Sequence, residues 1–232
     1  MSARELLLIR HAESTANVAG AAVEGSDAET VEMPVRDADV PLTQFGRDQA
    51  SAIAAWLQSL PDDEFPDAVW SSPYLRAFET ARLATASQRS RLPIRIDERL
   101  RDREMGILEG LTPHGIEARL PAEAARRRRL GKFYYRPPGG ESWADVMLRA
   151  RSLLFDLDRQ EASRVLVFSH DTTILTVRAI CERLMEGQIL ETERTEPLAN
   201  ASITRLVRSD AGEWSVACYN SVEHLPSAPL VE

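Results

Sequence analysis

Short continuous runs of apolar residues recur along the chain and are typical of β-strands. Residues 6–9 and 165–168 are the two clearest runs, and their lack of polar alternation predicts strands that are buried on both faces of a sheet. Residues 68–70 and 94–96 are shorter strand candidates. Two more runs, 203–207 and 214–219, flank a turn and predict a β-hairpin near the end of the chain.

Helical spacing of apolar residues fills most of the chain between these runs. After Thr43, which is suited to capping a helix, apolar residues recur every three or four positions until Pro61. Four further helices are expected, directly after Ser72 and over 113–131, 143–157 and 174–185. Strands that alternate with helices predict an α/β fold with a mainly parallel sheet covered on both faces. Ligands are then expected beyond the C-terminal ends of the strands.

The segment 18–40 departs from both patterns. Its acidic residues stand among small ones and are Glu24, Asp27, Glu29, Glu32, Asp37 and Asp39. The pattern predicts an acidic loop inserted in a single domain that spans residues 1–232. A chain of 232 residues is long enough for one large domain with a sizeable core.

Composition and charge narrow the class of protein. Apolar residues make up 44% and charged residues 28% of the chain, as in ordinary globular proteins. The net charge of −8 argues against nonspecific nucleic-acid binding, which draws on a basic surface. The first apolar run is too short for a membrane span or a signal peptide, so a cytoplasmic protein without membrane association is expected. The two cysteines lack the spacing of a disulfide framework or a zinc site.

Two of the four histidines follow the two clearest strands. His11 and His170 each stand just past a buried run, and at that position both side chains are expected to point into the same crevice. Each histidine could instead merely cap a strand end. A neutral imidazole can attack phosphorus and form a phosphohistidine when adjacent cations hold its pKa low, and Arg10 is such a cation.

Phosphoryl transfer also needs donors for the equatorial oxygens and an acid for the leaving oxygen. Arg76, near the start of a predicted helix, and Asn17 are candidate donors, although Arg76 could instead pair on the surface with a neighbouring acid such as Glu79 or Asp48. In the loop 100–110, Asp102 and Glu104 are both available as the acid.

Four motifs, in order, resemble the histidine phosphatase superfamily, in the branch that includes cofactor-dependent phosphoglycerate mutases. They are LIRHAES with Asn17, SSPYLRAFETA, LRDREMGILEG and VFSHD. The resemblance implies that His11 is the phosphorylated nucleophile, in a phosphate pocket with Arg10, Arg76 and His170. It also implies a three-layer α/β/α fold, no metal and no cofactor.

The resemblance extends to further residues of the site. Asn17 is implied to bind the phosphoryl group, and Ser14 in the same motif is included among the substrate-binding residues. PLTQFGRDQA is similar to the first-helix motif of the family, for which a structural role is expected.

Two departures from the family pattern affect the proton donor. The usual glutamate two residues after the leucine of the third motif is replaced by Asp102, with Glu104 two residues further on. The pair His170 and Asp171 resembles the phytase and acid-phosphatase branch, in which that aspartate supplies the proton. Asp171 is thus a third candidate for the acid, and it is also a candidate for substrate binding.

The expected function is hydrolysis of a phosphomonoester through a phosphohistidine, with a small phosphorylated metabolite as substrate. Two alternatives are a cofactor-dependent mutase that returns the phosphoryl group to another hydroxyl, and a non-catalytic phosphate-binding protein. The segments 18–40 and 126–138 are expected to overhang the pocket and to decide between water and a second hydroxyl. Residues 134–136 could contact the substrate or merely pack the helix. A homodimer is possible.

Overall fold

The computed structural model describes residues 3–86 and 92–225, and six strands within them form one sheet. The strands are β1 (Glu5–Arg10), β2 (Ala68–Ser71), β3 (Ile94–Ile96), β4 (Arg164–Ser169), β5 (Ile203–Arg208) and β6 (Trp214–Ser221), in the order β3-β2-β4-β1-β5-β6. The first four run parallel, and the hairpin of β5 and β6 adds to β1 in the antiparallel direction. The mainly parallel sheet and the terminal hairpin are confirmed.

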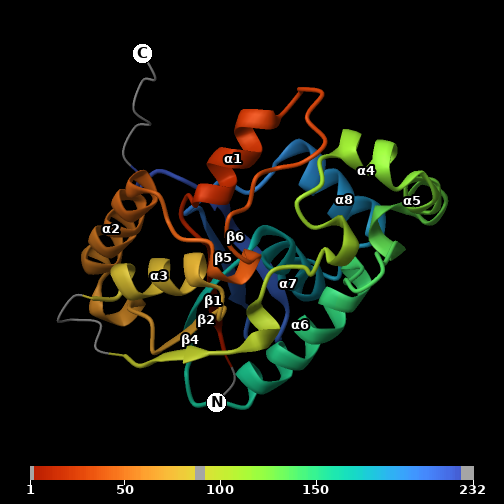
Figure 1. The fold of residues 1–232 in the computed structure, drawn as a ribbon. Coiled ribbons are helices and arrows are strands. Elements are labelled where there is room, and N and C mark those ends of the chain that lie inside the picture. The colour runs from red at the N-terminus through yellow and green to blue at the C-terminus, as the bar shows by residue number, and fades with distance from the viewer. Residues whose placement is uncertain (1–2, 87–91, 226–232) are drawn as a thin grey trace.

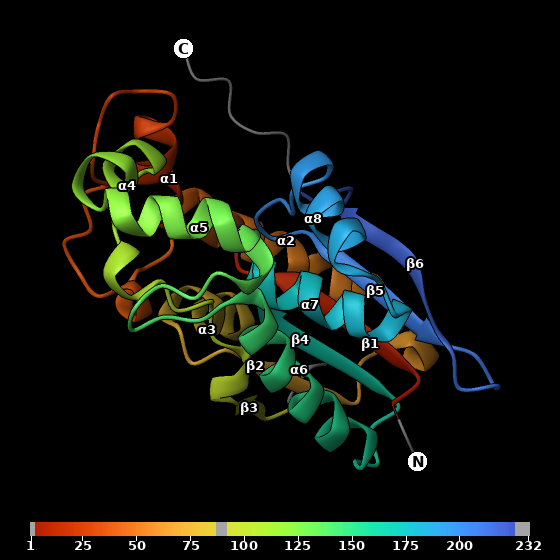
Figure 2. The same cartoon turned by 90° about the vertical axis from the view of Figure 1, so that its right-hand side faces the viewer.

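Helices cover both faces of this sheet. Helices α2 (Gln44–Ser59) and α3 (Leu75–Ala84) lie on one face, and α6 (Trp143–Asp158) and α7 (Asp171–Glu182) lie on the other (Figure 1). Helix α8 (Glu186–Thr195) follows α7, while α1 (Thr15–Val23), α4 (Pro113–Arg119) and α5 (Pro121–Tyr134) gather beyond the end of the sheet at which β1 stops (Figure 2). The three-layer α/β/α architecture is confirmed. No helix in the described ranges is long and apolar enough to cross a membrane.

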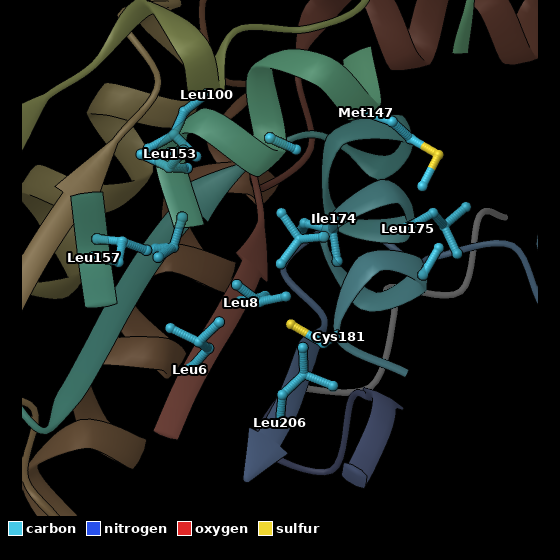
Figure 3. Packing of buried hydrophobic residues seen from close by; sticks show 14 of the residues in the cluster. Leu6, Leu8, Leu100, Met147, Leu153, Leu157, Ile174, Leu175, Cys181 and Leu206 are labelled. Atoms are coloured by element: carbon cyan, nitrogen blue, oxygen red, sulfur yellow. The ribbon is translucent and has the colours of Figure 1, made fainter. Parts of the chain in front are cut away.

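The central strand β1 contributes to a core on each side of the sheet. Successive side chains of a strand point to opposite faces, so Leu6 and Leu8 pack towards α6 and α7 (Figure 3), while Leu7 and Ile9 pack towards α2 and α3. All four side chains are 2% exposed or less. The continuous apolar run is therefore explained by burial on both faces.

The segment 18–40 is not wholly a loop, because residues up to Val23 belong to α1. Ser14 caps this helix, and a reciprocal bond with Asn17 completes a capping box. The small residues that suggested a loop are mostly alanines, which are strong helix formers. The rest of the segment is irregular except for an isolated bridge of Thr30 to Leu111 and a single turn of 3-10 helix at Asp37–Asp39.

Helix boundaries differ from the expectation at three places. The region 113–131 splits into α4 and α5 at Pro121, and the chain continues helically past Gly131, which has a positive φ of 76°. Helix α7 starts at Asp171, directly after His170, and ends before the separate and unpredicted α8. Helix α3 starts at Leu75, not directly after Ser72.

Candidate active site

The two predicted histidines lie together at the ends of adjacent strands. Arg10 of β1 stands opposite Ser169 of β4 in the parallel register, so the residues that follow them emerge side by side. The backbone N–H of His11 donates to the carbonyl of Ser169 at 2.9 Å, and the rings of His11 and His170 have centroids 5.1 Å apart. Both side chains are buried. The expected convergence of the two imidazoles is confirmed.

His11 is held in the form that a nucleophile needs. Its Nδ1 lies 2.8 Å from the carbonyl oxygen of Ala12. Because a carbonyl can only accept, Nδ1 carries the ring proton and Nε2 keeps its lone pair. Burial lowers the pKa of His11 well below its usual value, and the neighbouring charges of His170 and Arg76 lower it further. At neutral pH His11 is therefore an uncharged base.

His170 is fixed by contacts from two other segments. Its Nε2 lies 2.9 Å from the hydroxyl of Ser72, and its ring meets the ring of Tyr74 edge-on at 5.3 Å. Its Nδ1 lies 3.2 Å from Oδ2 of Asp102, but this approach is out of line for a hydrogen bond, and Nδ1 makes none with a described residue. Burial lowers the pKa of His170, although the charge of Asp102 opposes the shift.

Arg76 reaches the site from the first turn of α3. Its side chain is buried, with Nη1 donating to Oδ1 of Asp37 at 2.9 Å and Nη2 donating to Oδ2 of Asp102 at 2.8 Å. The pairing with Glu79 or Asp48 that the sequence left open is not the one observed. The guanidinium instead lies among the predicted site residues.

Asp102 is an ionised carboxylate in this arrangement. Burial alone would raise the pKa of its carboxyl group, but the charges of His170 and Arg76 hold that pKa well below the usual range. Its Oδ1 accepts from the backbone N–H of Arg103 at 2.8 Å. Near neutral pH Asp102 would hold a proton only if these positive charges were offset, as by an anion bound to Arg76.

Partly buried ionic contacts behind the site hold the loop that carries Asp102. Arg149 of α6 donates to the backbone carbonyls of Arg99 at 2.6 Å and Asp102 at 3.1 Å, and it pairs with Glu141 at 3.0 Å. The carboxylate of Glu141 also accepts from the backbone N–H of Glu104 at 3.1 Å. These contacts fix the backbone on both sides of the candidate acid.

The other two candidate acids lie differently. Glu104 is held through its backbone, whose carbonyl accepts from the N–H of Glu141 at 2.9 Å. Asp171 is the first residue of α7, and its carboxylate is 46% exposed and lies 3.8 Å from Nη2 of Arg10. Of the three candidates, Asp102 is the one that contacts both His170 and Arg76.

Arg10 extends from the end of β1 beside His11. Its Nη1 donates to the backbone carbonyl of Leu198, and its Nε is buried without a hydrogen bond to any residue in the described ranges. A buried guanidinium nitrogen without a partner is costly to leave unsatisfied. Arg10 thus retains donor capacity for an anion.

Asn17 and Ser14 are joined through the cap of α1. Oδ1 of Asn17 accepts from the N–H of Ser14 at 3.0 Å, from its hydroxyl at 2.8 Å and from Nδ2 of Asn200 at 3.2 Å. The amide NH₂ of Asn17 is thus the part that can meet a ligand. Ser14 was expected to bind the substrate, but its hydroxyl bonds to Asn17 in the helix cap.

The first residues of α2 hold the loop after His11. Thr43 donates its hydroxyl to the carboxylate of Glu13 at 2.6 Å, and the side chain of Gln49 accepts from the N–H of Glu13 at 2.8 Å. A Cβ atom at Gly46 would lie 2.0 Å from the carbonyl oxygen of Glu13. The motif PLTQFGRDQA therefore packs closely against this loop and bonds to it.

Three residues at the site were not expected from the sequence. Asp37 bonds to Arg76, Ser72 contacts His170, and Asn200 donates to the backbone carbonyl of His11 at 3.1 Å. Ser72 stands in a quoted motif and could have been found there. Asp37 was one acid among many in its segment, and Asn200 lies in a loop far along the chain, so no local pattern marked either residue.

The segment after α5 packs against the protein and forms ion pairs. Tyr135 is 1% exposed and donates its hydroxyl to Glu123, and Arg136 pairs with Asp145. Residues 134–136 were expected either to contact the substrate or to pack the helix, and Tyr135 packs. Arg127 and Arg128 line a hollow of about 520 Å³ between α4 and α5.

The site contains the kinds of hydrogen-bond donors that proteins use to bind phosphoryl groups. Two arginines, two imidazoles and one amide meet near the ends of β1 and β4, where a charged ligand would be surrounded by donors. In the part of the chain that the structure describes, no group of three or more histidine, cysteine, aspartate or glutamate side chains could hold a metal ion.

The relatives that this chain resembles in sequence include phosphatases and a mutase. Over 221 residues the chain is 29% identical to a glucosyl-3-phosphoglycerate phosphatase of Mycobacterium tuberculosis, an alignment that covers 93% of this chain and 88% of the relative. It is 32% identical over 167 residues to 2,3-bisphosphoglycerate-dependent phosphoglycerate mutase 2 of Gloeobacter violaceus, covering 69% and 74% of the two chains. It is 33% identical over 177 residues to a 6-phosphofructo-2-kinase/fructose-2,6-bisphosphatase of Caenorhabditis elegans, covering 76% of this chain and only 34% of that longer protein.

The fold and the family agree with these relatives. A mycobacterial glucosyl-3-phosphoglycerate phosphatase in complex with VO3 matches with a TM-score of 0.72 at 28% identity, covering 94% of this chain and all of that chain. Residues 6–222, which include every predicted site residue, match the model of the histidine phosphatase superfamily, branch 1. The chain belongs to this superfamily.

Proposed function

We propose that this protein is a phosphomonoesterase that transfers the phosphoryl group of a small phosphorylated metabolite first to His11 and then to water. The observation that carries the proposal is the state of His11. Its Nδ1 is committed to the carbonyl of Ala12 and its pKa is lowered, so Nε2 offers a free lone pair at neutral pH. The phosphatase activity named for the mycobacterial relative supports this choice of reaction.

In the first step, the lone pair on Nε2 of His11 forms the new bond to phosphorus while the bond from phosphorus to the leaving oxygen breaks. Arg10, Arg76 and the amide of Asn17 donate to the phosphoryl oxygens, whose charge they offset. The leaving oxygen takes a proton from a carboxylic acid. The second step reverses these roles, because water attacks phosphorus, the electron pair returns to Nε2 and the acid regains a proton.

We assign the acid to Asp102. Its carboxylate contacts both Arg76 and His170, whereas Asp171 is more exposed and Glu104 is held through its backbone. A doubly negative phosphoryl group that binds Arg76 beside Asp102 offsets the positive charge of the arginine. The pKa of the Asp102 carboxyl group then rises. The substrate thus provides the condition under which Asp102 holds the transferable proton.

The organic part of the substrate needs a place beyond the phosphoryl group. A hollow of about 650 Å³ lies between the end of α1 and the start of α4, with Gly20, Val23, Leu111 and His114 in its wall. Both flanking segments lead away from the site, one from the loop after His11 and the other from the loop with Asp102. We propose that this mixed apolar and polar hollow receives the leaving group.

Turnover of p-nitrophenyl phosphate by the wild type and by His11→Ala tests the proposal. Release of phosphate by the wild type and none by the variant is expected, and radiolabel from the substrate should be trapped on His11 after an alkaline quench. Equal rates in the two proteins would exclude the mechanism. Inactivity of both proteins, with phosphate bound normally, would favour the non-catalytic alternative.

The mutase alternative rests on the relative from Gloeobacter violaceus. A panel of phosphorylated metabolites, scored for free phosphate with and without 2,3-bisphosphoglycerate, separates the two reactions. We expect released phosphate that does not depend on the bisphosphate. Isomerisation that requires the bisphosphate, with little phosphate released, would assign the chain to the mutases.

A further inference from the structure

Both terminal nitrogens of Arg76 are engaged by acidic residues. Nη1 donates to the backbone carbonyl of Asp37 at 2.7 Å and to its Oδ1 at 2.9 Å, while Nη2 donates to Oδ2 of Asp37 at 3.2 Å and to Oδ2 of Asp102 at 2.8 Å. One positive charge therefore faces two carboxylates. A phosphoryl group can form a two-pronged contact with this guanidinium only if one carboxylate withdraws.

Asp102 is the carboxylate that is anchored. Its Oδ1 accepts from the backbone N–H of Arg103, and its backbone carbonyl accepts from the partly buried side chain of Arg149. The adjoining backbone is bonded to Glu141. Withdrawal of Asp102 would therefore disrupt several hydrogen bonds.

Asp37 is held much more lightly. It opens a single turn of 3-10 helix that has no side-chain cap, and its carboxylate is 31% exposed. Among the described residues, the bonds that Asp37 makes beyond its own turn all go to Arg76. The segment is secured further away, where Thr30 bridges to Leu111 and the carbonyl of Pro41 accepts from Thr15. The turn can thus move while its flanks stay in place.

We propose that Asp37 is an internal competitor for the phosphate-binding Arg76, occupying it between turnovers and giving way when a phosphoryl group binds. Its bidentate contact imitates the one that phosphate oxygens make with arginine. The inference rests on the proposed function, because it assumes that Arg76 receives the phosphoryl group.

The competition has a consequence for product release. Inorganic phosphate binds through the phosphoryl pocket alone, whereas a substrate also gains contacts through its organic part. Both ligands must displace the same carboxylate from Arg76, so the competition lowers the affinity for inorganic phosphate and for substrate by about the same factor. Asp37 thus lowers the phosphate affinity of the site and favours release of inorganic phosphate after hydrolysis.

Asp37→Asn tests the proposal, because the amide keeps the shape and removes the charge. Asp39→Asn is the matched control, since Asp39 stands on the same turn and pairs with the exposed Arg36. Titration calorimetry with inorganic phosphate needs no turnover. We expect Asp37→Asn to bind phosphate about tenfold more tightly than the wild type, with stronger inhibition by phosphate and orthovanadate, and Asp39→Asn to bind like the wild type.

Two outcomes would overturn the proposal. Unchanged phosphate affinity in Asp37→Asn would show that the carboxylate does not compete, and weaker affinity would show that it only positions Arg76. Asp37→Ala serves as a second variant with the same expectation, in case the amide forms a new bond to Arg76. Cleavage of p-nitrophenyl phosphate by the wild type is measured separately, so failure of this inference is distinct from failure of the proposed function.

Discussion

The ring of His11 is oriented by the carbonyl of its own neighbour Ala12, 2.8 Å from Nδ1. Ala12 lies in the loop that follows β1, and its backbone carbonyl fixes the tautomer of the ring. The nitrogen that we propose as the nucleophile is thereby exposed by the course of the main chain.

The first prediction concerns this tautomer. Nitrogen-15 spectra of the wild type should show His11 protonated on Nδ1 and bare on Nε2 throughout the neutral range. His11→Gln should fold normally and lose activity by about 10³-fold or more, because an amide nitrogen has no free lone pair for phosphorus. A variant with wild-type turnover, or a ring protonated on Nε2, would contradict the assignment of the nucleophile.

The second prediction concerns stability in acid. His11 and His170 both have a lowered pKa in the folded protein because they are buried, so the unfolded chain binds more protons than the folded one below the ordinary histidine pKa of about 6.5. Stability should therefore fall as the pH drops from 7 towards 5. Melting temperatures across this range should decline less steeply for His11→Gln, and an identical slope would show that His11 is not buried uncharged.

The third prediction separates the candidate acids. Asp102→Asn should slow the hydrolysis of an alkyl phosphate by about 10²-fold or more, because the alkoxide needs a proton, but should slow p-nitrophenyl phosphate much less. Glu104→Gln and Asp171→Asn are the matched comparisons. A leaving-group dependence that appears in Asp171→Asn and not in Asp102→Asn would move the acid to the start of α7.

Parallel-strand topology explains why the histidine pair was predictable and the acids were not. A buried run that ends in a polar residue marks the C-terminal edge of a sheet, so His11 and His170 could be placed together from local pattern alone. The choice between Asp102 and Glu104 depends on the orientation of a loop that Arg149 and Glu141 hold from another helix, and no local pattern encodes those contacts.

The features that the sequence did not predict were missed for similar physical reasons. The helix α1 was hidden because alanine and glycine in an acidic context resemble a loop, although the cap at Ser14 was present in the sequence. Asp37 reaches Arg76 across the site, so its partner is fixed by the tertiary fold. Charged residues reveal their partners only after the chain has folded, whereas apolar spacing reveals the helix or strand directly.

The fourth prediction tests the ionic contacts of Arg149 behind the site. Arg149→Leu removes the donor to two backbone carbonyls and one of the positive charges that pair with Glu141. The free energy of unfolding should therefore fall by about 3 kcal/mol, and kcat should fall with it. Arg151→Leu, at an exposed position of the same helix, is the control and should change stability by less than about 0.5 kcal/mol. Chemical denaturation measures both values. A loss of stability in Arg149→Leu without any change in kcat would mean that Asp102 does not depend on this support.

The fifth prediction uses two glycines in helices. A Cβ at Gly46 would lie 2.0 Å from the carbonyl oxygen of Glu13, which is main chain and cannot move without shifting the loop that follows His11. Gly46→Ala should therefore destabilise the protein and reduce activity. At Gly20 a Cβ meets nothing within 4 Å, so Gly20→Ala should stabilise α1 by about 0.5 to 1 kcal/mol through helix propensity. Thermal unfolding with parallel activity assays measures both, and opposite signs of the stability change are expected. A Gly46→Ala variant as stable and as active as the wild type would contradict this prediction. It would show that close packing of α2 against the loop after His11 is not needed to hold His11.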